Sequence, residues 1–90
     1  MQDLIYGIAD SIIDGDTFIL KVTETGKTNR NNYSKWERVR IMSLDAAELG
    51  ALRGLRDKVN LEKALQGKNV SCSVQTKDTF GRVVADVKII

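Results

Sequence analysis

Histidine is absent from this 90-residue chain, and cysteine occurs only once, at Cys72. Without histidine there is no imidazole general base, no Ser-His-Asp triad and no histidine-ligated metal site. A single cysteine excludes an intrachain disulfide and a cysteine-rich zinc site. Any bound metal must therefore be held by oxygen ligands, which favours hard cations such as Ca²⁺ or Mg²⁺.

Long apolar runs and a strong net charge are also missing. No apolar stretch approaches the roughly 18 residues of a membrane span, so no membrane partner is expected. Residues Met1–Asp3 lack the basic region that begins a signal peptide, and the compartment stays open between the cytoplasm and export after processing. The net charge of +2 is too small to identify a nucleic-acid binder by itself.

The composition is that of an ordinary globular protein, with 42% hydrophobic and 29% charged residues. The length predicts one domain over residues 1–90. Alternating apolar residues predict five short strands, at residues 4–13, 17–22, 37–44, 69–75 and 82–89. The pair Asp14–Gly15 is typical of a hairpin turn, and the polar residues 23–35 predict a long loop.

One helix is expected, over residues 51–66, with Gly67 as its stop. Leu52, Leu55 and Val59 share a face at helical spacing, and Leu61 and Leu65 lie about half a turn away. The resulting order, βββαββ, predicts a mainly β fold with one helix. A five-stranded OB-fold barrel is favoured because closure removes the exposed sheet edges.

Acidic residues are expected to meet at one end of this barrel. Asp16 begins the second strand and Asp45 ends the third, so antiparallel pairing brings both to the same end. Glu48 follows Asp45 by three residues. Converging carboxylates repel one another unless a cation lies between them, which predicts an oxygen-ligated metal.

Two arginines are expected near the same end. Arg40 lies on the third strand, on the face opposite Val39, and Arg82 opens the fifth strand. In an OB barrel the loops between strands one and two and between strands four and five flank the ligand face. Carboxylates, a hard cation and two guanidinium groups are what phosphodiester cleavage requires.

These residues stand in four motifs that resemble, in order, those of the staphylococcal nuclease (thermonuclease) family. The motifs are Ile13–Thr17 (IDGDT), Val39–Glu48 (VRIMSLDAAE), Gly67–Val70 (GKNV) and Asp78–Arg82 (DTFGR). The family has an OB barrel with a helix between strands three and four. The resemblance therefore implies Ca²⁺-dependent cleavage of DNA and RNA that leaves 3′-phosphates, with single strands as the favoured partner.

The resemblance also implies a role for each matching residue. Arg40 and Arg82 would bind the scissile phosphate, and Glu48 would be the general base that activates water. Ca²⁺ would be held by Asp16, Asp45 and the main-chain carbonyl of Ala46.

This sequence departs from the family at several positions. Thr79 and Phe80 stand where the prototype has Lys-Tyr, at positions that contact substrate, and Phe80 either stacks on a base or packs in its loop. The family continues with further helices beyond the position of Ile90, so self-association that completes the core is one expectation. An OB module that binds nucleic acid without catalysis and a protein-interaction domain are the alternatives to a nuclease.

The loop over residues 23–35 offers a second basic segment. It contains Lys27, Arg30 and Lys35, with Tyr33 beside them, and Trp36 follows. Basic residues interleaved with aromatic ones can bind single strands. The loop is expected at the barrel end opposite Asp16, so a solvated loop with a locally packed Trp36 is favoured.

Overall fold

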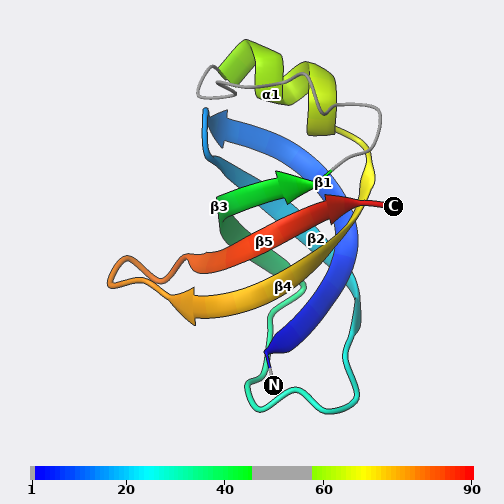
Figure 1. Cartoon of the computed structure of the whole chain (residues 1–90), viewed down its shortest axis with the longest axis vertical. Coiled ribbons are helices and arrows are strands. Elements are labelled where there is room, and N and C mark those ends of the chain that lie inside the picture. The colour runs from blue at the N-terminus through cyan, green and yellow to red at the C-terminus, as the bar shows by residue number, and fades with distance from the viewer. Residues whose placement is uncertain (1, 46–57) are drawn as a thin grey trace.

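The computed structural model describes residues 2–45 and 58–90 (Figure 1). The elements are β1 (Asp3–Asp14), β2 (Thr17–Thr25), β3 (Trp36–Asp45), α1 (Lys58–Leu65), β4 (Asn69–Lys77) and β5 (Val83–Ile89). Every predicted strand is present, with ends that differ from the predicted ones by at most three residues. Among the described residues, no helix is long and apolar enough to cross a membrane.

The strands form a closed barrel in the order β1-β2-β3-β5-β4. The long strand β1 pairs antiparallel with both β2 and β4, which closes the barrel. Strands β3 and β5 pair in parallel, and the other neighbours are antiparallel. Across the described residues this is the mainly β fold with one helix that the sequence predicts, and its strand order agrees with an OB-like barrel.

Side-chain alternation fills the interior of the barrel. On β2, Phe18 and Leu20 are fully buried, whereas Ile19 between them is partly exposed. The inward face of β4 is Val70, Cys72 and Val74, as predicted. Burial raises the pKa of the Cys72 thiol to about 12, so it is an inert core residue.

Gly7 on β1 lies directly against the backbone of β2. The register between them shifts beside this residue, and Gly7 pairs with Val22. A Cβ atom at Gly7 would lie 1.9 Å from the carbonyl oxygen of Lys21. The absence of a side chain at position 7 therefore permits the pairing that leads into the β1–β2 turn.

Helix α1 covers one end of the barrel (Figure 1) and packs on β1. Its buried residues are Leu61, Ala64 and Leu65. Val59 is largely exposed, so its predicted place on the apolar face is wrong; Leu61 and Leu65 hold the helix to the core instead. Leu52 and Leu55 lie outside the described residues.

The helix ends where the sequence predicts. Gly67 has φ +80°, a left-handed conformation that favours glycine after a helix. Its N–H donates to the Ala9 carbonyl at 2.7 Å, and the Ala9 N–H donates to the Lys68 carbonyl at 3.0 Å. These bonds attach the end of α1 to β1 directly.

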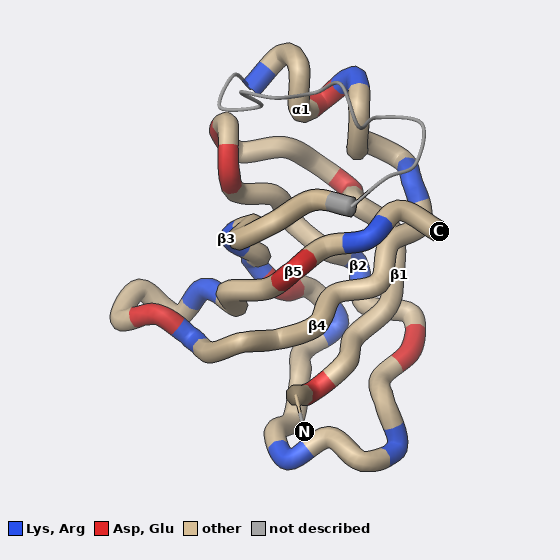
Figure 2. The backbone as a smooth tube through the Cα atoms, in the orientation of Figure 1, with Lys and Arg blue, Asp and Glu red and all other residues tan. Residues whose placement is uncertain are grey.

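The loop between β2 and β3 is shorter than predicted, because β2 continues to Thr25. Asp3 organises it: the carboxylate accepts bonds from the Arg30 and Asn31 N–H groups at 2.8 and 3.1 Å, and from the Tyr33 hydroxyl at 2.7 Å. Bonds led by the one from Arg30 lower the pKa of Asp3 to about 2. Figure 2 shows this loop, with its basic residues, at the barrel end away from α1.

Candidate phosphate-binding site

The turn between β1 and β2 presents its acidic residues through local hydrogen bonds. The Asp16 N–H donates to the Asp14 carboxylate at 3.1 Å, an interaction typical of aspartate in turns. Hydrogen bonding to Asp16 lowers the pKa of Asp14. The Thr17 hydroxyl donates to Asp16 at 2.9 Å, and the Asp16 carbonyl accepts from the Ile41 N–H at 2.7 Å. Asp16 is therefore fixed against β3.

Arg40 reaches Asp16 from the neighbouring strand. It pairs with Thr17 across β2 and β3, and its Nε lies 3.6 Å from an Asp16 carboxylate oxygen. Both side chains are about half exposed. An ion pair this exposed contributes little to stability, so both groups keep surface with which to bind a ligand.

Arg82 is held more firmly than Arg40. Its Nε donates to the Asp78 carboxylate at 2.6 Å, and the exposed fractions of the two side chains are only 22% and 16%. Its Nη1 donates to the Thr17 hydroxyl at 3.5 Å. These two bonds leave part of the guanidinium fork for an additional acceptor.

Asp78 also organises the turn between β4 and β5. One of its carboxylate oxygens accepts the N–H groups of Phe80 and Arg82, each at 2.9 Å. Burial alone would raise the pKa of Asp78, but the bonds from Arg82 and Phe80, together with the Arg82 charge, lower it. Asp78 therefore stays ionised and pairs with Arg82 at neutral pH.

Two separate turns thus meet at one point on the barrel. Three sequence-predicted residues, Asp16, Arg40 and Arg82, come together there, linked by Thr17 and supported by Asp78. We call these five residues the arginine corner. The sequence motifs contain Thr17 and Asp78, but nothing in their spacing indicates that they orient the arginines.

Of the other predicted metal and catalytic residues, the structure describes only the backbone of Asp45. Asp45 ends β3, where its backbone pairs with Lys88. The backbone register sets Asp16 beside Ile41, so β3 extends four residues beyond the contact before it reaches Asp45. Ala46 and Glu48 lie outside the described residues.

The predicted substrate-contact residues lie on the exposed β4–β5 turn. Both Thr79 and Phe80 face solvent, and Phe80 is 78% exposed. The Arg82 Cζ lies 5.5 Å from the centre of the Phe80 ring, a cation–π distance. Phe80 does not pack in its loop, so an exposed aromatic face adjoins the arginine corner.

The Ca²⁺ site stays a prediction. Asp16 supplies the half-exposed carboxylate oxygen that Ca²⁺ prefers, and in this respect the donor chemistry fits. Across residues 2–45 and 58–90 there is no group of three acidic or cysteine side chains that would hold a metal. The predicted ligand set reaches into residues outside that range.

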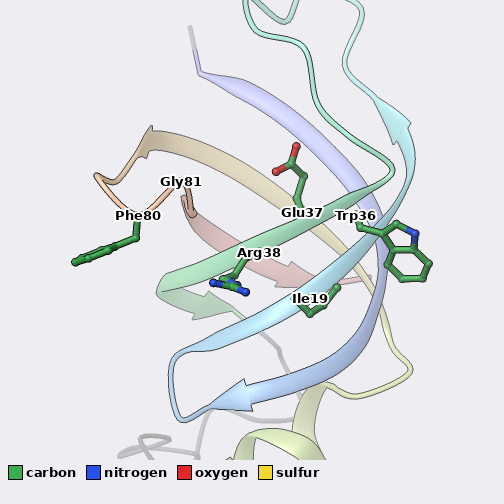
Figure 3. Close-up of a pocket in the computed structure, with 6 residues that line it drawn as sticks. All are labelled: Ile19, Trp36, Glu37, Arg38, Phe80 and Gly81. Atoms are coloured by element: carbon green, nitrogen blue, oxygen red, sulfur yellow. The ribbon is translucent and has the colours of Figure 1, made fainter.

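A hollow of about 280 Å³ adjoins the arginine corner and is missed by sequence reasoning (Figure 3). It is lined by Ile19, Trp36, Glu37, Arg38, Phe80 and Gly81. Figure 3 shows Phe80 and Trp36 at its two ends, with Arg38 and Ile19 between them. It joins β2 and β3 to the distant β4–β5 turn, a juxtaposition that no single segment of sequence indicates.

No protein-family model matches this chain, and no curated protein matches it. The likeness to the staphylococcal nuclease family therefore rests on the four motifs alone.

Proposed function

We propose that this protein is a nuclease that binds nucleic acid at the arginine corner and hydrolyses its phosphodiester bonds. The observation behind the proposal is the convergence of Arg40 and Arg82, from two different parts of the chain, on the Asp16–Thr17 turn. Two guanidinium groups at one site suit the oxygens of a phosphate, whose geometry matches the arginine fork. The motifs shared with the staphylococcal nuclease family favour catalysis over binding alone.

The arginines would act on the negative charge of the reacting phosphate. Because Asp78 and Thr17 already hold Arg82, little reorganisation is needed when charge builds on the phosphoryl oxygens. Arg40 is less constrained and would bind a second oxygen of the same phosphate. Preorganised donors of this kind typically contribute about a hundredfold to a thousandfold in rate each.

The hydrolysis requires a nucleophile and a base as well. Water would attack phosphorus, Glu48 would accept its proton, and the P–O5′ bond would break to leave a 3′-phosphate and a 5′-hydroxyl that takes a proton from solvent. Ca²⁺, bound by Asp16, Asp45 and the Ala46 carbonyl, would polarise a phosphoryl oxygen.

The test is cleavage of labelled single-stranded DNA and RNA by the full chain, in Ca²⁺ and in excess EDTA. We expect Ca²⁺-dependent cleavage that falls about a hundredfold or more in Glu48→Gln, Arg40→Lys and Arg82→Lys, because lysine keeps the charge but loses the fork. Lys27→Gln, in the loop at the opposite barrel end, removes a charge without touching the site and serves as the control. Cleavage that survives EDTA, or that Glu48→Gln leaves intact, would refute the mechanism.

A nucleic-acid-binding module without catalysis is the second candidate. It is favoured by one observation: the exposed ring of Phe80 stands at a cation–π distance from Arg82, an arrangement that suits a base beside a phosphate. A folded protein that binds oligonucleotides but cleaves none under any metal condition would select this candidate.

A further inference from the structure

The outer surface of β2 and β3 forms a continuous row that begins at the arginine corner. Three cross-strand pairs make up this row: Thr17 with Arg40, Ile19 with Arg38, and Lys21 with Trp36. Trp36, Arg38 and Arg40 occupy alternate positions on β3, so their side chains point to the same, outward side. The row therefore leads from the paired arginines along the strand to an exposed tryptophan.

The side chains on this row combine aromatic and basic groups. Trp36 is 48% exposed, and the Lys21 Nζ lies 5.9 Å from its ring centre. Phe80 stands at the opposite end of the hollow, with Arg82 against its ring. We call Ile19, Lys21, Trp36, Arg38 and Phe80 the stacking face.

Arg38 distinguishes this face from an ordinary solvated strand. Arg40 is paired with Asp16 and Arg82 with Asp78. Within the described part of the chain, Arg38 forms no ion pair and no side-chain hydrogen bond, although Glu37 is its neighbour. The Glu37 carboxylate instead accepts the Ser34 N–H at 2.7 Å, on the buried side of β3. An uncommitted guanidinium group between two exposed aromatic rings matches a phosphate that lies between two bases.

We propose that the stacking face binds single-stranded nucleic acid along β3, with bases on Phe80 and Trp36 and an intervening phosphate on Arg38. This inference rests on the proposed function, which places one phosphate at the arginine corner. It extends the binding site from that phosphate to several nucleotides. Aromatic faces together with basic side chains are how proteins hold single strands without reading their sequence.

The form of the face favours single strands over duplex. Phe80 and Trp36 can stack only on bases whose faces are free, and in a duplex those faces are covered by neighbouring base pairs. A hollow of about 280 Å³ also lies near the lower end of the roughly 300–1,000 Å³ range of small-ligand sites, which suits one nucleotide unit rather than a double helix.

Trp36 makes the test direct because it is the only tryptophan in the chain. The full chain in excess EDTA, which suppresses metal-dependent cleavage, would be titrated with an oligothymidylate of about eight nucleotides, within the known range for one OB fold. We expect the tryptophan fluorescence to be quenched as the oligonucleotide binds. A duplex of equal length should bind at least tenfold more weakly and quench less.

Variants then assign the binding to the stacking face, with affinity measured by anisotropy of a labelled oligonucleotide. Trp36→Ala should weaken binding about tenfold, whereas Trp36→Phe should retain most of it. Arg38→Gln should weaken binding and lower the salt dependence by about one phosphate contact. Ile90→Ala is the control for an exposed apolar residue, at 74% exposure, and Lys27→Gln is the control for charge; neither should change affinity more than about twofold.

The outcomes separate this proposal from the nuclease. Quenching and loss of affinity in Trp36→Ala, in a protein that never cleaves, would uphold the stacking face and overturn the nuclease. Cleavage with an unchanged affinity in both Trp36→Ala and Arg38→Gln would overturn the stacking face and leave the nuclease standing. Equal affinity for duplex would overturn the single-strand assignment, and a folded protein that binds no oligonucleotide would overturn both.

Discussion

The close approach of β1 and β2 at Gly7 makes a large, specific prediction for Gly7→Ala. The added Cβ would lie 1.9 Å from the Lys21 carbonyl oxygen, 2.8 Å from its carbonyl carbon and 3.1 Å from the Val22 Cα. All three atoms belong to backbone, so no side chain can rotate away. Ordinary contact needs about 3.5 Å, and relief requires the strands to separate by about 1.5 Å.

The energetic cost follows from that separation. Moving β1 from β2 by about 1.5 Å weakens roughly two interstrand hydrogen bonds, each worth about 1 kcal/mol, and overpacking adds about 1–3 kcal/mol. Alanine recovers only about 0.5 kcal/mol through the unfolded chain. We expect Gly7→Ala to lower the free energy of unfolding by about 3–4 kcal/mol, against a total of about 5–13 kcal/mol for a domain of this size.

Gly67→Ala is the matched control, because alanine there destabilises the fold through backbone conformation rather than through a steric clash. Nothing lies within 4 Å of a Cβ at Gly67, but its φ of +80° disfavours alanine by about 1–2 kcal/mol. Gly67→Asn should recover part of that loss, since asparagine tolerates this conformation, whereas Gly7→Asn should recover none. Urea unfolding followed by circular dichroism measures all four variants. A loss below about 1 kcal/mol for Gly7→Ala, or one no larger than for Gly67→Ala, would refute the steric argument.

Three further predictions concern the core and the loop. Leu65→Ala should lower the free energy of unfolding by about 3 kcal/mol in urea titrations, because Leu65 is fully buried and holds α1 to the core; Lys63→Ala, on the exposed side, should cost under about 0.5 kcal/mol. The Cys72 thiol, with its pKa near 12, should resist a disulfide reagent at pH 8 in the native protein and react at once in denaturant; rapid native reaction would contradict its burial. Because the folded-state pKa of Asp3 is lowered from 3.8 to about 2, its ionised form stabilises the fold above about pH 4, and this contribution is lost as the pH falls toward 2. In Asp3→Asn the fall of the urea midpoint between about pH 4 and pH 2 should become smaller. A fall as large as in the unmodified protein would show that Asp3 does not organise the loop.

The strands were predictable because their apolar residues alternate with a period of two, and a barrel interior enforces that period. The prediction was weaker at strand ends: β2 continues to Thr25, where pairing with β1 sustains a polar strand that the sequence alone suggests is loop. The prediction of which helix side chains are buried was wrong at Val59. The apolar residues cover too much of the helix circumference to define one face, and in the fold Leu61 and Leu65 are the ones that pack on the barrel.

The arginine corner was predictable to the level of strand topology and no further. Antiparallel pairing of β2 and β3 is enough to bring Asp16 and Arg40 to one place. The orientation of Arg82 depends instead on the bonds from Asp78 and Thr17, which side-chain geometry decides and residue spacing does not. The stacking face was not predictable, since Phe80 lines the same hollow as Trp36 and Arg38 only because β5 pairs in parallel with β3.

The two arginines are held in ways that suit different tasks. Arg82 is mostly buried, and it donates hydrogen bonds to the Asp78 carboxylate and the Thr17 hydroxyl. Because the pKa of Asp78 is lowered, the ion pair is present at neutral pH and fixes Arg82 before any ligand binds. Arg40 is half exposed and its pair with Asp16 is longer, so a ligand can draw it away at little cost. If a cation competes for Asp16, it releases Arg40 toward a bound phosphate. On this argument, binding of a cation at Asp16 and binding of a phosphate at Arg40 should strengthen each other, because each frees the partner that the other needs.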